Sequence, residues 1–163
     1  MDSEDRSTQK DTSSSAVTSS LSDLIARLEK AQGPDRCLDA DIAVYRQREA
    51  VKAGGGLALS IHASMASPGL VEDSAGVWRS LHYTSSIDAA MTLVPDGMEK
   101  DFTDLYGIAR VSVGINANPG PFYGTHEGGS LAIALCIAAL KAQLSTRNNE
   151  QDDARNLSGV SSE

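Results

Sequence analysis

The chain of 163 residues has few cysteines, few aromatic residues and a shortage of basic charge. Its two cysteines, Cys37 and Cys136, stand in apolar helical patterns without CxxC or histidine-rich spacing, so we expect reduced, buried thiols and no disulfide framework. The formal net charge of −8 leaves no basic patch for a phosphate backbone, which argues against nucleic-acid binding. The aromatic fraction of 4% offers no stacking platform for single strands.

Long hydrophobic runs are also missing. The most apolar stretch, Leu131 to Leu140, is far shorter than the roughly 20 residues that a membrane-spanning helix needs. The N-terminal stretch "MDSEDRSTQKDTSSS" contains no apolar segment, so we expect no secretory signal. The sequence therefore predicts a soluble, cytoplasmic protein that does not bind a membrane.

Two terminal segments contain almost nothing to bury. Residues 1–19 and 145–163 are polar and rich in Ser and Asp, and we predict two disordered tails because no burial would offset the entropy of ordering them. Residues 20–144 carry a net charge of −4 and form one domain. Within it, residues 53–77 concentrate Gly, Ala and Ser, and we expect a loop or insertion there.

Apolar residues at helical spacing predict four helices. Ser20 and Asp23 form an acidic variant of the capping box before a stripe over residues 21–28. Asp35 is the expected cap of a second helix, whose stripe begins at Leu38. The pattern then predicts a third helix over 86–94 and a final core helix, apolar nearly all round, over 131–144.

Between the last two helices the period changes to two. Ala109, Val111, Val113 and Ile115 alternate with polar or small residues, which indicates a strand with one buried face. We expect its partner strand within residues 98–105. The chain is therefore predicted to be α+β: an α/β/α sandwich with a small antiparallel sheet flanked by helices, in the order α-α-loop-α-β-β-α.

Four segments together resemble the phage ABA sandwich domain, a family of small proteins of tailed phages and prophages. They are "LIARLEKAQGPDRCLDADIA", "YTSSIDAAMTLVPDG", "ARVSV" and "LAIALCIAALKA". The resemblance implies a phage or prophage origin and a fold of helices, sheet and helices; it brings no reaction and no catalytic residues. The sequence lacks the Gly-Trp step that commonly follows the second helix of the family, and segment 47–77 has no counterpart.

The stretch "HYTSSID", residues 82–88, brings possible acids, bases and nucleophiles close together in sequence. A catalytic triad needs a geometry that usually comes from distant segments, so this proximity favours helix capping over catalysis. We interpret Ser85 as the N-cap and Asp88 as the N3 residue of the third helix. Ser85 and Ser86 at the exposed helix start remain candidates for anchoring an anion.

The histidines give no metal-site pattern. His62, His82 and His126 lie in unrelated segments without a second ligand at i+2, i+3 or i+4, so we expect neither a metal nor a cofactor. His126 stands in the glycine-rich stretch "GTHEGG", interpreted as a connector that could instead contact a phosphate. Arg110, on the solvent side of its strand, is the best single choice for binding an anion.

These observations leave two hypotheses of different kinds. The first is a non-enzymatic phage or prophage accessory protein, an interaction or binding module with an unknown protein partner in the bacterial cytoplasm. The alternative is a protein that sequesters a nucleotide-like anion and so blunts host defence signalling, using Ser85, Ser86, Arg110 and His126. A hydrolase built on His126 and Glu127 is a remote third.

Overall fold

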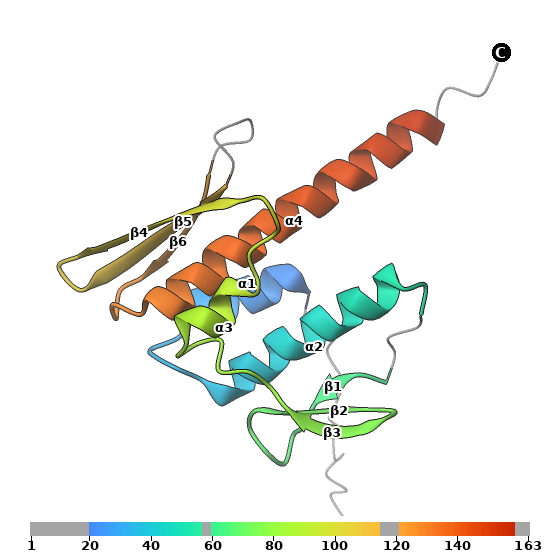
Figure 1. The fold of residues 1–163 in the computed structure, drawn as a ribbon, viewed down its shortest axis with the longest axis horizontal. Coiled ribbons are helices and arrows are strands. Elements are labelled where there is room, and N and C mark those ends of the chain that lie inside the picture. The colour runs from blue at the N-terminus through green and yellow to red at the C-terminus, as the bar shows by residue number, and fades with distance from the viewer. Residues whose placement is uncertain (1–19, 57–59, 115–120, 159–163) are drawn as a thin grey trace, which may run out of the picture.

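The computed structural model describes residues 20–56, 60–114 and 121–158 (Figure 1). The predicted tail 1–19 and the last five residues of the predicted tail 145–163 lie outside the described residues. The elements in chain order are α1 (Leu21–Glu29), α2 (Arg36–Ala53), β1 (His62–Ala63), β2 (Leu70–Asp73), β3 (Gly76–Arg79), α3 (Ile87–Met91), β4 (Glu99–Leu105), β5 (Ile108–Gly114), β6 (Phe122–His126) and α4 (Leu131–Ser158).

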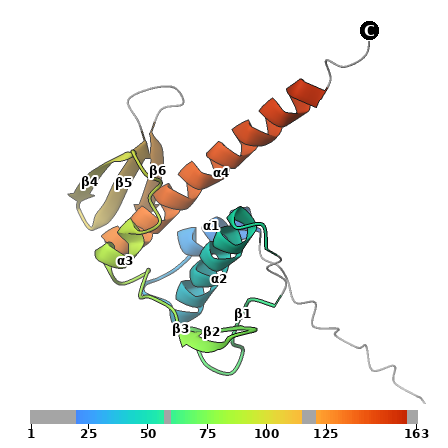
Figure 2. The same cartoon turned by 45° about the vertical axis from the view of Figure 1, so that its right-hand side comes forward.

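Two antiparallel three-stranded sheets lie on opposite sides of the helices (Figures 1 and 2). The first sheet, in the order β1-β2-β3, packs on α2, and the second, in the order β4-β5-β6, packs on α4. Helices α1 and α3 also contact α4, which is therefore the central element. The predicted α+β class and the approximate order of the elements are confirmed, with a second sheet and a third strand added to the predicted sheet.

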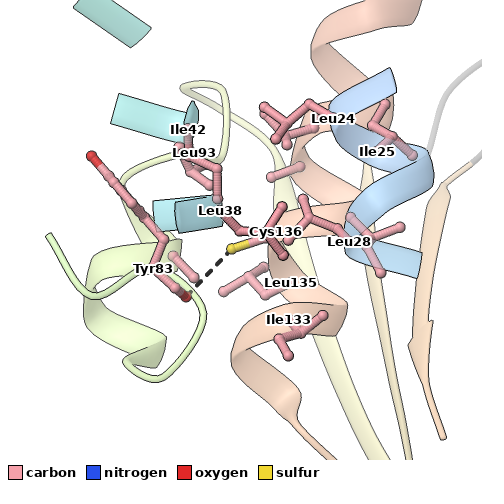
Figure 3. Packing of buried hydrophobic residues seen from close by; sticks show 14 of the residues in the cluster. Leu24, Ile25, Leu28, Leu38, Ile42, Tyr83, Leu93, Ile133, Leu135 and Cys136 are labelled. Carbon is pink, nitrogen blue, oxygen red and sulfur yellow. Dashed lines mark hydrogen bonds between the residues drawn. The ribbon is translucent and has the colours of Figure 1, made fainter. Parts of the chain in front are cut away.

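The hydrophobic core forms where α1, α2 and the first half of α4 meet (Figure 3). Leu28, Ile42 and Leu135 are fully buried there, one from each helix. Tyr83, which precedes α3, is buried and also belongs to this core. The strip of α4 from Ala132 to Leu140 is buried on every side, because a sheet covers one face and helices cover the others.

The two cysteines differ in environment. Cys136 is buried, and its Sγ donates a hydrogen bond to the carbonyl oxygen of Tyr83 at 3.4 Å (Figure 3). Burial, and to a lesser extent the charge of Asp39, raises the pKa of the Cys136 thiol. Both cysteines are free, but Cys37 is exposed, so the prediction that it is buried was wrong. It lies beside Leu38 in the first turn of α2, and only Leu38 faces the core.

The first two helices begin as predicted. Ser20 Oγ accepts a hydrogen bond from the Asp23 N–H, and the Asp23 carboxylate accepts one from the Ser20 N–H, both at 3.1 Å. Asp35 caps α2 by accepting hydrogen bonds from the N–H groups of Cys37 and Leu38. Because a capping side chain satisfies amides that have no partner within the helix, the start of each helix could be read from local sequence.

The segment predicted as a loop or insertion, 53–77, contributes most of the first sheet. β2 and β3 form a hairpin in which Val71 pairs with Trp78 and is fully buried against α2. Asp73 shapes its turn, accepting hydrogen bonds from the Ala75 N–H and from the Trp78 indole at 2.7 and 3.1 Å. These bonds lower the pKa of Asp73. The strands are too short for their alternation to stand out from the surrounding Gly and Ser.

The predicted strand pair is present as β4 and β5, whereas β6 was not predicted from the sequence. Gly124, in the middle of β6, hides the strand pattern because glycine is uncommon in strand interiors. Its role is close packing, since a Cβ at this position would lie 1.8 Å from the carbonyl oxygen of Ala134 in α4. The helix and the sheet therefore approach more closely here than any side chain would permit.

Helix α4 is longer than predicted, because residues 145–158 continue the helix and do not form a disordered tail. No Pro or Gly interrupts the chain between Leu131 and Ser158. Arg147 ties the extension to α2 through an ion pair with Glu49, and its guanidinium lies 5.3 Å from the centre of the Tyr45 ring. Helix α3, in contrast, ends at Met91, short of the predicted 94.

Candidate functional site

The start of α3 differs by one residue from the prediction. Ser86, and not Ser85, is the N-cap, and its Oγ accepts a hydrogen bond from the Ala89 N–H at 3.2 Å. Ser85 is exposed, and its amide donates to the carbonyl of His82 in the turn that precedes the helix. The one-position shift follows from that turn, in which the amides of both serines bond to His82. Ser86 is therefore occupied as a cap, and Asp88 lies at N2 of a helix of five residues.

His126 has a structural environment. It ends β6, is 5% exposed, and both of its ring nitrogens are engaged. Nδ1 lies 3.0 Å from the N–H of Ser130 and can only accept from it, so Nε2 carries the proton and donates to the carbonyl of Ala31 at 3.1 Å. The imidazole thus joins the end of α1 to the start of α4. This arrangement leaves neither nitrogen open to a ligand.

Arg110 is exposed on the outer face of the second sheet, as predicted. It pairs with Thr103 on β4 and Thr125 on β6. Its neighbour in the ladder, His126, pairs with Ala109 and points to the opposite face. The four predicted ligand-binding residues are therefore divided between the outer sheet face, the buried sheet face and the start of α3, and the fold does not bring them together.

A buried polar network between α2 and the loop that leads to α3 was not predicted from the sequence. Asp39 is 1% exposed. Its Oδ1 accepts hydrogen bonds from the N–H and the hydroxyl of Thr84, at 2.7 and 2.9 Å, and its Oδ2 pairs with the Arg36 guanidinium at 2.7 Å. Arg36 also donates to the carbonyls of Ser80 and Leu81. The network fixes the path of residues 80–84 and so positions α3.

A signal for this network was present in the sequence. Asp39 follows Leu38 and precedes Ile42 by three positions, so it lies within the buried stripe of its helix, where a charge requires a partner. Arg36, one turn before it, is that partner. The sequence could not indicate Thr84, which is 45 positions away and meets Asp39 only in the folded chain.

A cleft of about 880 Å³ opens at the connection between α1 and α2. Three cationic side chains, Arg27, Lys30 and Arg36, line it. The two arginines form ion pairs with carboxylates of α2, at 2.6 and 2.7 Å. The start of α2 is occupied by the carboxylate of Asp35, which accepts from the first amides of the helix. The cleft therefore offers an anion one cation, Lys30, that has no ion pair among the described residues.

The β4–β5 hairpin extends away from the helices (Figures 1 and 2). Its two-residue turn, Tyr106-Gly107, has both residues at positive φ, 55° and 78°, as in a type I′ turn. Leu105 and Ile108 close the turn and are 60% and 45% exposed, while Tyr106 is fully exposed. We call these three side chains the hairpin tip. They give the hairpin an apolar and aromatic end, beside which β6 pairs with β5 as far as Ala109.

No group of three or more His, Cys, Asp or Glu side chains that could hold a metal ion occurs in the part of the chain that the structure describes. Within that same part, none of the helices has the length and apolar character to cross a membrane. Comparisons of the chain with protein-family models, with curated proteins and with solved structures gave no match. The fold alone defines the class of protein, an α+β fold with two small antiparallel sheets.

Proposed function

We propose that this protein is a non-enzymatic interaction module that binds a protein partner through the hairpin tip. The observation that carries the proposal is the exposure of Leu105, Tyr106 and Ile108 at one end of the hairpin. Tyrosine is enriched among residues that dominate binding energies, because it combines a large contact area with a hydroxyl group. The pairing of β4 and β6 with β5 orders the backbone of the hairpin before a partner binds, which lowers the entropy cost of binding.

The backbone of Tyr106 supports this role. A φ of 55° is uncommon for a residue other than glycine, and type I′ turns favour Asn, Asp or Gly at this position. A tyrosine in this conformation costs stability, and backbone strain of this kind is concentrated at functional sites. Contact of the Tyr106 ring with a partner would explain why a tyrosine occupies this position although it makes the turn less stable.

Replacement of Tyr106 by asparagine separates binding from folding. The full chain, immobilised, is used to capture proteins from a bacterial lysate, alongside Tyr106→Asn and the control Tyr123→Ser. Tyr123 is a second exposed aromatic residue, on the outer face of the same sheet and away from the hairpin tip. We expect wild type and the control to retain one specific partner, and Tyr106→Asn to lose it with an unchanged or higher Tm.

The loss of affinity expected for Tyr106→Asn is about 30-fold or more, as for the truncation of a residue that dominates an interface. Equal retention by wild type and Tyr106→Asn would refute the role of the hairpin tip. Capture of no specific protein by any variant would count against the module itself. An origin in a phage or prophage remains part of the proposal, and it rests on the resemblance of the four sequence segments.

The second candidate, sequestration of a nucleotide-like anion, is supported by the cleft between α1 and α2. The cleft is open to solvent, and Lys30 is available at its wall. The test is a thermal-shift screen with nucleotides and cyclic nucleotides, using Lys30→Ala as the comparison. A ligand that raises the Tm of wild type, but not of the variant, would favour sequestration. If no nucleotide changes the Tm of wild type, the sequestration hypothesis is refuted.

A further inference from the structure

The outer edge of β4 is a second surface, separate from the hairpin tip. The strand order β4-β5-β6 places β4 at the edge of its sheet, and neither view shows another described element along its outer side (Figures 1 and 2). Six of its seven residues are exposed. An edge strand presents a row of backbone N–H and C=O groups that a further strand can pair with.

The hairpin determines which backbone groups face outward. In a hairpin with a two-residue turn, the closing pair exchanges both of its backbone hydrogen bonds, and here that pair is Leu105 and Ile108. Residues 99, 101, 103 and 105 therefore bond to β5. The N–H and C=O groups of the alternate residues, Lys100, Phe102 and Asp104, point away from β5, toward the open edge.

The side chains of these three residues are arranged symmetrically. Lys100 and Asp104 stand two positions before and two positions after Phe102. When two copies of β4 lie antiparallel about a two-fold axis at Phe102, Lys100 of each copy is opposite Asp104 of the other. The two Phe102 side chains, each 40% exposed in the single chain, then lie opposite one another. A six-stranded sheet would run continuously through both copies.

Other antiparallel registers lose this complementarity. A shift of the pairing by two residues in one direction places the two Asp101 carboxylates opposite each other and Lys100 opposite Phe102. A shift in the other direction places Asp104 opposite Phe102. Since like charges directly opposite destabilise a sheet and opposite charges stabilise it, the register centred on Phe102 is favoured. The edge is thus complementary to itself.

We infer that β4 is a dimerisation strand that pairs antiparallel with β4 of a second copy of this chain, in the register centred on Phe102. The interface consists of one strand and its flanking side chains, which places it among small, reversible interfaces. The inference does not rest on the proposed function, because the residues that face the open edge, Lys100, Phe102 and Asp104, are not part of the hairpin tip. Tyr106, which the capture experiment replaces, lies outside β4. Loss of partner capture and loss of dimerisation are therefore separate results.

Charge reversal with mixing tests the register. The mass of the full chain is measured by sedimentation equilibrium from about 1 μM to about 1 mM, a range that covers weak dimers. We expect wild type to pass from monomer to dimer with concentration. Lys100→Asp and Asp104→Lys each place like charges opposite one another twice per dimer, so each should raise the dimer Kd at least about tenfold.

An equimolar mixture of Lys100→Asp and Asp104→Lys chains restores two opposite-charge pairs and should dimerise as wild type does. The double variant, which exchanges the two charges within one chain, should do the same. Because the mixture contains the same folded chains that fail to dimerise separately, misfolding cannot account for its recovery. A wild type that stays monomeric up to the highest concentration, or a mixture that gains nothing over the separate variants, would overturn the inference.

Phe102→Pro blocks the edge by a different route. The N–H of Phe102 points outward, so proline removes a donor that pairing between two copies of β4 needs. It leaves the hydrogen bonds between β4 and β5 in place. We expect a monomer with the circular dichroism spectrum of wild type. If this variant keeps its fold and still dimerises with the wild-type Kd, the contact lies elsewhere on the chain and the inference is wrong.

Discussion

The replacement Asp39→Ala removes the acceptor at the centre of the buried network. The carboxylate is 1% exposed and receives three hydrogen bonds of 2.7 to 2.9 Å, two from Thr84 and one from Arg36. Loss of one partner of a buried ion pair costs about 3–5 kcal/mol. The low end of this range applies to the ion pair itself, because the remaining Arg36 side chain is 27% exposed and keeps its hydrogen bonds to the carbonyls of Ser80 and Leu81. The Thr84 N–H also loses its acceptor, a loss of about 1–3 kcal/mol that overlaps with the first. We expect a total destabilisation of about 3–5 kcal/mol.

Urea unfolding followed by circular dichroism measures this change as a lower transition midpoint with an unchanged m-value. The matched control is Asp41→Ala, two positions along the same helix. Asp41 pairs with Arg27 near the surface, with side chains 25% and 44% exposed, so its loss should cost about 0–1 kcal/mol. Equal midpoints for the two variants, or a cost of Asp39→Ala below about 1 kcal/mol, would refute the account of the network.

Two further predictions concern residues at which the structure corrected the sequence analysis. Ser86→Ala should destabilise the protein by about 0.5–2 kcal/mol through the lost cap, whereas Ser85→Ala should have a smaller effect; the reverse order in urea unfolding would support the cap predicted from sequence. In the native protein, a thiol reagent should modify Cys37 at once, because it is exposed, and Cys136 only on unfolding, because burial raises its thiol pKa. Equal rates for the two thiols, measured by mass spectrometry, would contradict this.

The elements that sequence analysis predicted correctly are those specified by local patterns. The stripe from Leu21 to Leu28 lies between a capping box and a Gly-Pro stop, and each of these signals spans only a few residues. The alternation from Ala109 to Val113 also predicts which side chains are buried, because one face of β5 packs on α4 and the other is exposed to solvent. In both cases the environment of a residue follows from its neighbours in sequence.

The errors arose where distant contacts override local preference, or where a local pattern permits two alternatives. Glycine is typical of loops, so Gly124 did not indicate a strand. It lies in the middle of β6, where α4 leaves no room for a Cβ. Ser85 and Ser86 are equivalent as caps in sequence, and the turn anchored on His82 selects Ser86. The polar residues after Leu144 have little to bury and were predicted to be disordered. They continue α4, and Arg147 forms an ion pair with Glu49 on α2, a helix distant in sequence.

The sequence alone determined the α+β class, the starts of the first two helices and the buried face of β5, because capping and periodicity act over a few residues. Only the tertiary structure decided which polar residues meet. It placed His126 and Arg110 on opposite faces of one sheet, joined Asp39 to Thr84, and left the edge of β4 and the hairpin tip uncovered. Contacts between distant segments depend on how helices and sheets pack, and no local pattern encodes that packing.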